Sequence, residues 1–211
     1  MKKFLILLIS FFTIINILKA DEKGYLQSAY DALLAGEFES AVVFYDKAIE
    51  AKDDYAPAYY GKGLANSNLG KVKESINDFS KAVYYDNNMA DAHYALGLSY
   101  IQDGSYTEAI SSLDKAIDLD KTKSDYFYAR GNAFKLNSQY DKALIDFSKA
   151  IDLDSKYGLA YYARGALHKL EGRGDAALRD LEKYLELNAN RDGYENEVNR
   201  LIQEIREGRV N

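Results

Sequence analysis

Apolar and small residues along this chain recur at the three- and four-residue spacing of amphipathic helices. In residues 107–119 they fall on one helical face, at Ala109, Ile110, Leu113, Ala116 and Ile117. A second helical pattern covers residues 91–102, and Asp-Gly-Ser at 103–105 separates the two patterns. Because glycine accepts the backbone conformation of a tight turn, this stretch predicts two helices joined by a short connection.

This predicted helix pair occurs five times, with a period of 34 residues. Sister positions carry the same type of residue in each copy, and the lysine column is Lys47, Lys81, Lys115, Lys149 and Lys183. A small-residue column reads Ala29, Gly63, Gly97, Gly131 and Gly165, and a turn column reads Gly36, Gly70, Gly104, Ser138 and Gly172. A fixed period of this size is typical of stacked helical units. The units are residues 22–55, 56–89, 90–123, 124–157 and 158–191.

A last amphipathic pattern follows the repeats, within residues 192–211. Its apolar face carries Val198, Leu201, Ile202 and Ile205, and charged residues occupy the other faces. The end of a helical stack exposes an apolar face that needs a cover. Residues 194–207 are therefore predicted to form a capping helix.

The small and aromatic columns resemble the tetratricopeptide repeat pattern over about residues 22–190. The third and fourth units match best, at His93, Leu96, Gly97, Tyr100, Ala109, Leu113 and Ala116, and at Phe127, Gly131, Phe134, Ala143, Phe147 and Ala150. The family's tryptophan at repeat position 4 and its proline near the unit end are absent. The resemblance implies an all-α, right-handed superhelical solenoid of antiparallel helix pairs that binds another protein.

The resemblance also implies that the first helix of each unit lines a concave groove, through repeat positions 2, 5, 9, 12 and 13. Position 5 reads Leu26, Tyr60, Tyr94, Tyr128 and Tyr162. The predicted groove residues are Tyr60, Tyr94, Tyr128, Tyr162, Asn68, Gln102, Asn132, Lys135 and Lys169. Exposed tyrosines suit an extended peptide, because they offer a large contact area and a hydroxyl group. The alternative is that these tyrosines only pack against the next unit.

The two groove lysines, Lys135 and Lys169, are candidates to attract an acidic segment. Some proteins of the family clamp a chaperone's terminal carboxylate with Lys and Asn of the first helices. Asn132 fits one such place, but Tyr128 stands where the clamp lysine would be. Binding of chaperone tails is therefore not predicted.

Charge varies together at repeat positions 7 and 23. Where position 7 is a cation, position 23 is an aspartate, and where one is uncharged, so is the other. A half-buried cation needs a partner to offset its desolvation. Three structural ion pairs are predicted: Lys62 with Asp78, Arg130 with Asp146, and Arg164 with Asp180.

Composition narrows the range of functions. The formal net charge of −6, without a basic cluster, argues against nucleic acid as a partner. Without cysteine there is no disulfide or thiolate metal site. His93 and His168 occupy columns that hold aromatic residues in sister units, which favours packing over catalysis or metal binding. We expect no enzyme activity, cofactor, metal or small-molecule substrate.

The first residues form a separate pattern. Lys2 and Lys3 precede an apolar run over residues 4–18, and Ala20 is followed by a charged stretch. This order is typical of a secretory signal peptide over residues 1–20, which predicts export to a bacterial periplasm or secretion. The alternative is a retained membrane anchor through residues 4–18, which alone would bring membrane contact.

The sequence thus predicts an exported scaffold that binds a protein or peptide segment in a tyrosine-lined groove. The alternative is a structural subunit of an envelope complex that uses its ends or convex face. The identity of the partner and the oligomeric state are not encoded in any motif.

Overall fold

The computed structural model describes residues 23–188 and 194–209. All regular structure among these residues is helical, and the all-α fold class predicted from the sequence is confirmed. The chain forms two compact units that divide between Asp103 and Gly104. The apolar segment at residues 4–18 and its predicted cleavage site lie outside the described residues. No helix among the described residues combines the length and apolar character needed to span a membrane.

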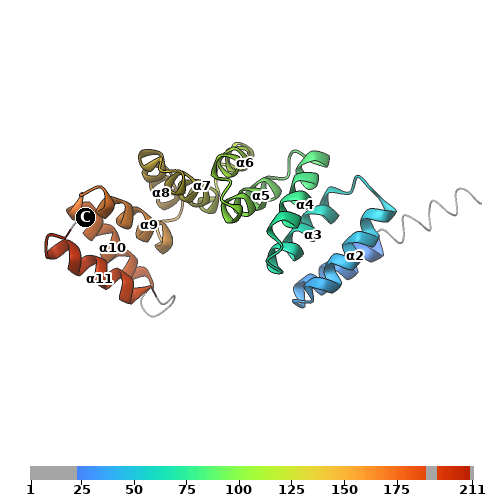
Figure 1. Ribbon diagram of the computed structural model, residues 1–211, viewed down its shortest axis with the longest axis horizontal. Coiled ribbons are helices and arrows are strands. Elements are labelled where there is room, and N and C mark those ends of the chain that lie inside the picture. The colour runs from blue at the N-terminus through green and yellow to red at the C-terminus, as the bar shows by residue number, and fades with distance from the viewer. Residues whose placement is uncertain (1–22, 189–193, 210–211) are drawn as a thin grey trace, which may run out of the picture. The chain divides into compact units, whose positions relative to one another are not determined.

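The first compact unit begins with helical residues 23–34. It continues with α2 (Phe38–Ala51), α3 (Ala56–Asn68), α4 (Val72–Tyr85) and α5 (Ala90–Asp103). Each helix packs against the next, and α3 also contacts α5. Figure 1 shows α3 and α4 lying side by side in this unit. Contacts between neighbours in the chain are the arrangement expected of a repeat.

The second compact unit holds α6 (Tyr106–Leu119), α7 (Ser124–Leu136), α8 (Tyr140–Leu153), α9 (Gly158–Leu170), α10 (Gly174–Asn188) and α11 (Glu195–Arg206). The predicted pair at 91–102 and 107–119 corresponds to α5 and α6 within one residue. Helix α7 packs on α8, α9 packs on α10, and α11 contacts both α9 and α10.

Glycine in the small-residue column allows close contact between the two helices of a repeat. A Cβ atom on Gly131 of α7 would lie 2.7 Å from Cε1 of Phe147 in α8, and one on Gly63 would lie 2.7 Å from the ring of Phe79. Both rings are almost fully buried. The missing side chain therefore makes room for the aromatic ring of the partner helix.

The turn between the helices of a repeat depends on a residue with positive φ. Gly36, Gly70, Gly104 and Gly172 have φ between 71° and 84°, and Ser138 takes the same place with φ of 58°. In the turn after α7, the Ser138 N–H donates to the Lys135 carbonyl and the Gln139 N–H to that of Phe134. These two bonds satisfy carbonyl groups that the helix end leaves without a partner.

The C-terminal helix α11 buries the apolar face that its sequence pattern predicted. Val198, Leu201, Ile202 and Ile205 pack with Ala177, Leu181 and Tyr184 of α10. Tyr184 stands where the repeat pattern has a small residue, and its side chain is fully buried in this cluster. The last repeat thus ends in a larger side chain because α11 follows it.

Candidate peptide-binding groove

An apolar cavity of about 550 Å³ opens in the first compact unit. It lies between the first helix, α2 and α3, and most of its lining comes from repeat positions 2, 5, 9 and 12. The lining residues include Lys23, Leu26, Gln27, Tyr30, Leu33, Tyr45, Tyr55, Pro57, Tyr60, Gly61 and Leu64. This volume falls within the range of small-molecule and side-chain pockets, and a few apolar side chains of a peptide would fill it.

Tyr60 contributes to both the cavity and the packing between repeats. It is half-buried, and its ring centroid lies 5.9 Å from that of Phe79. It also packs against the cluster of Phe79, Ala95 and Leu96, which reaches into the next repeat. Burial raises the pKa of the Tyr60 hydroxyl above its usual value. The same side chain therefore lines the cavity and packs against the next repeat.

Several cavity residues were not among the predicted groove residues. Tyr30 is 52% exposed and occupies repeat position 9, the column of Leu64 and Asn132. Tyr45 of α2 and Tyr55, which precedes α3, lie outside the first-helix positions that the prediction considered. A Cβ atom on Gly61 would overlap the Tyr45 ring, so glycine at this point leaves room for the tyrosine. Its repeat position, 9, is one of those that the resemblance assigns to the groove, and this could have identified Tyr30.

The remaining predicted groove residues of the first unit lie apart from this cavity. Tyr94 is half-buried in α5, and Gln102 is exposed near the end of that helix. Asn68 is exposed at the end of α3, where its side-chain amide donates to the Leu64 carbonyl, 2.9 Å away. None of the three lines the cavity.

In the second compact unit, Tyr128 and Tyr162 are also half-buried between aromatic rings. The Tyr128 ring lies 5.0 Å from that of Tyr157 and 5.9 Å from that of Phe147. Tyr162 lies 5.6 Å from Tyr184. Burial raises the pKa of Tyr128, while a hydrogen bond with Asn132 lowers it in part. Asn132 and Tyr128 are therefore in contact on the face of α7.

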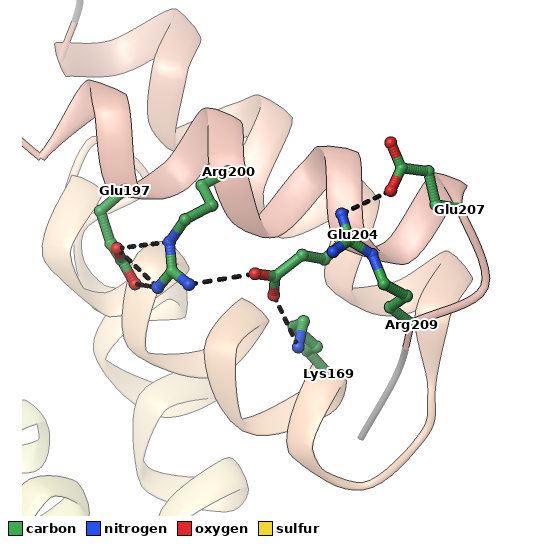
Figure 2. A network of polar contacts seen from close by, with 6 residues as sticks. All are labelled: Lys169, Glu197, Arg200, Glu204, Glu207 and Arg209. Atoms are coloured by element: carbon green, nitrogen blue, oxygen red, sulfur yellow. Dashed lines mark hydrogen bonds and ion pairs between the residues drawn. The ribbon is translucent and has the colours of Figure 1, made fainter.

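The two groove lysines have different surroundings. Lys169 of α9 forms an ion pair with Glu204 of α11, with Nζ 3.1 Å from Oε2. The hydrogen bond from Lys169 holds the pKa of Glu204 below its usual value. Glu204 also accepts from Arg200, which in turn binds Glu197 (Figure 2). Lys135 of α7 has no carboxylate within ion-pair distance among residues 23–188 and 194–209.

Each cation at repeat position 7 contacts the aspartate of its own unit. Arg130 donates from Nε and Nη2 to the two carboxylate oxygens of Asp146, at 2.8 and 2.7 Å. Arg164 binds Asp180 in the same two-pronged way, at 2.8 Å for each bond. Lys62 Nζ lies 3.8 Å from Asp78, whose other oxygen accepts from the Asn66 amide. The pattern of covarying charge thus located residues that lie together.

The same cations reach a second partner, in the preceding unit, that the sequence comparison missed. Lys62 lies 2.7 Å from Asp46, Arg130 donates to Asp114 at 2.7 Å, and Arg164 donates to Ser148 at 3.0 Å. The partner in the preceding repeat lies 16 residues before the cation in the sequence. The aspartate in the same repeat lies 16 residues after the cation. The cation therefore ties two successive second helices together.

The histidines have the packing surroundings expected from their columns. His93 is buried, and its Nε2 lies 3.1 Å from the side-chain oxygen of Asn87. Burial lowers the pKa of the half-buried His168. Within residues 23–188 and 194–209, no three His, Asp or Glu side chains gather as metal ligands.

Comparison with known proteins agrees with this architecture. A family model described as "TPR repeat" matches residues 68–104 and 97–138, and one described as "Tetratricopeptide repeat" matches residues 124–157. No curated protein matched the chain.

Several solved structures are similar in fold to this chain. A MamA crystal structure is 25% identical, covering 75% of this chain and 93% of its own, with a TM-score of 0.73. YrrB, described as "a TPR protein with an unusual peptide-binding site", is 24% identical, with 93% and 97% covered and a TM-score of 0.75. MamA from Desulfovibrio magneticus RS-1 is 21% identical, with 82% and 98% covered and a TM-score of 0.77. Residues 68–157 thus match tetratricopeptide repeat models, and the chain has the fold of the solved structures named above.

Proposed function

We propose that this chain is a non-enzymatic scaffold that binds a peptide segment of a protein partner through its tyrosine-lined first helices. The observation that carries the proposal is the apolar cavity of about 550 Å³ in the first compact unit. Most of its lining comes from the helix face to which the family resemblance assigns the binding residues. A preformed apolar cavity lowers the ordering cost of binding, because few receptor side chains must be immobilised.

The chemistry of the lining defines the peptide. Leu26, Leu33 and Leu64 supply apolar contacts, and tyrosine hydroxyls with the Gln27 amide supply hydrogen bonds for a peptide backbone. YrrB, a protein of similar fold, is described as having a peptide-binding site, which supports a peptide as the kind of partner.

A selection from displayed, randomised decapeptides on the full chain tests this proposal. We expect enriched peptides to lose binding to Tyr30→Ala and Tyr60→Ala variants. Tyr84→Ala is the matched control, because Tyr84 is 80% exposed and does not line the cavity. Circular dichroism checks that all variants remain helical. Peptides that bind all four chains equally would favour the alternative, an assembly subunit that uses its ends or convex face.

We also propose that the protein is exported, with residues 1–20 removed as a signal peptide. The support is the order of basic, apolar and small residues at the start of the chain. Amino-terminal sequencing of the protein from cells tests this point. A chain that starts at Asp21 is expected, and an intact start in the membrane fraction would favour the anchor at residues 4–18.

A further inference from the structure

The two lysines at repeat position 12 of the last two repeats differ in one respect. Both are half-buried near the end of a first helix, Lys135 on α7 and Lys169 on α9. Lys169 is neutralised by Glu204, which follows it by 35 residues and comes from α11 (Figure 2). The residue 35 positions after Lys135 is Leu170 of α9, whose side chain is 59% exposed. At the same separation in sequence, α9 therefore carries a leucine and not a carboxylate.

The Lys135 ammonium group belongs to a helix face that carries other polar groups. Tyr128, Asn132 and Lys135 are spaced by four and three residues, so they follow one another along α7. The Asn132 side chain lowers the pKa of Tyr128 in part, which places the two side chains close together. Burial lowers the pKa of Lys135, and no charged neighbour among the described residues offsets this effect. A half-buried cation without a counter-charge gains more from an arriving carboxylate than an exposed lysine does.

We infer that Lys135 binds an acidic side chain of the peptide partner, in the way that Lys169 binds Glu204. The Lys169–Glu204 ion pair shows, within the same chain, that a carboxylate can neutralise a lysine at this repeat position. Asn132 lies one helical turn before Lys135 on α7. This inference rests on the proposed function and adds that the peptide segment bound on α7 carries an acidic side chain.

The test uses the randomised decapeptide library on the full chain, with Lys135→Gln and Lys135→Glu variants. Lys149→Gln is the matched control, because Lys149 is an exposed lysine of α8. One enriched peptide and its Glu→Gln counterpart are then measured by fluorescence anisotropy. We expect the acidic peptide to bind the natural chain roughly tenfold more tightly than its neutral counterpart, as a charged hydrogen bond provides. Lys135→Gln should remove this preference, Lys135→Glu should reverse it, and Lys149→Gln should retain it.

The two kinds of failure can be told apart. If peptides are enriched but show no preference for Asp or Glu, or keep that preference in Lys135→Gln, the role of Lys135 is refuted and the proposed function stands. If no peptide is enriched on the natural chain, while circular dichroism shows a helical protein, the proposed function is refuted. The inference that Lys135 binds an acidic side chain is then refuted as well.

Discussion

At the scale of single residues, the structure rests on groups that have a defined partner in a neighbouring repeat. Covarying charge in the sequence pointed to Asp146 beside Arg130, because both residues belong to the same unit. It could not indicate Asp114, since the comparison was made within units and Asp114 belongs to the preceding one. Lys169 was expected in an open groove, but its partner Glu204 lies on α11, outside the repeat period.

Arg130 is expected to contribute to stability mainly through Asp146. The Asp146 side chain is 3% exposed, and replacing Arg130 by Met leaves this carboxylate buried without its cation. We expect Arg130→Met to lower the free energy of unfolding by about 3 kcal/mol. Asp114→Asn is the comparison, because Asp114 is 52% exposed and its pairing contributes at most about 1 kcal/mol. Urea denaturation measures both, and equal losses would contradict the assignment.

Ser138 is the non-glycine residue in the turn column, and its positive φ carries strain. A left-handed backbone conformation costs a residue with a Cβ atom about 1 kcal/mol, and replacement by glycine removes this cost. Glycine also has more conformational freedom in the unfolded chain, which lowers the free energy of unfolding by about 0.5 kcal/mol. Ser138→Gly should therefore raise the free energy of unfolding by about 0.5 kcal/mol. Thermal and urea denaturation check this value, with Ser138→Ala expected to show no gain.

At the scale of helices, the sequence predicted the positions of the helices more accurately than the residues that line the cavity. The apolar spacing placed α5 and α6 to within one residue, because each helix must bury one face. The cavity was harder to predict, since Tyr45 and Tyr55 come from segments outside the first helices. Which side chains line a cavity depends on how helices pack, and a small residue such as Gly61 changes that packing without changing the helical pattern.

The contact between α9 and α11 indicates how α7 could be given an internal acidic partner. Leu170→Glu places a carboxylate 35 residues after Lys135, the separation of Lys169 and Glu204. We expect the new ion pair to raise the pKa of Lys135, which burial lowers in the natural chain. A pH titration of the lysine side chain by NMR measures this change. Ile145→Glu, at a 67% exposed site on α8, should leave the pKa of Lys135 unaltered.

At the scale of the whole molecule, stability is a sum of local interfaces between neighbouring helices. Separate apolar clusters hold the helices of the first unit and those of the second. In such a chain, a local defect is felt most strongly by the adjoining repeats. This organisation follows from the 34-residue period, and so it could be predicted from the sequence.

A substitution at Gly131 tests this local organisation. A Cβ atom there would lie 2.7 Å from the Phe147 ring and 3.3 Å from Cβ of Asp146, so Gly131→Ala should cost about 1–3 kcal/mol. Hydrogen exchange followed by mass spectrometry should show the largest acceleration in α7, α8 and α9, and the smallest in residues 23–34. Gly24→Ala, with open space around the new Cβ atom, is the control. Equal acceleration throughout the chain would contradict the local description.

The pairing of Lys169 with Glu204 has a consequence for how such a chain can lengthen during evolution. Consider a copy of the last repeat inserted between α10 and α11. The residue 35 positions after Lys169 would then be the copy of Leu170 in the new first helix, and not Glu204. The cap would then neutralise only the lysine of the new copy. Each duplication would thus add one more lysine without a carboxylate partner from the cap, and the number of such lysines would increase with the length of the chain.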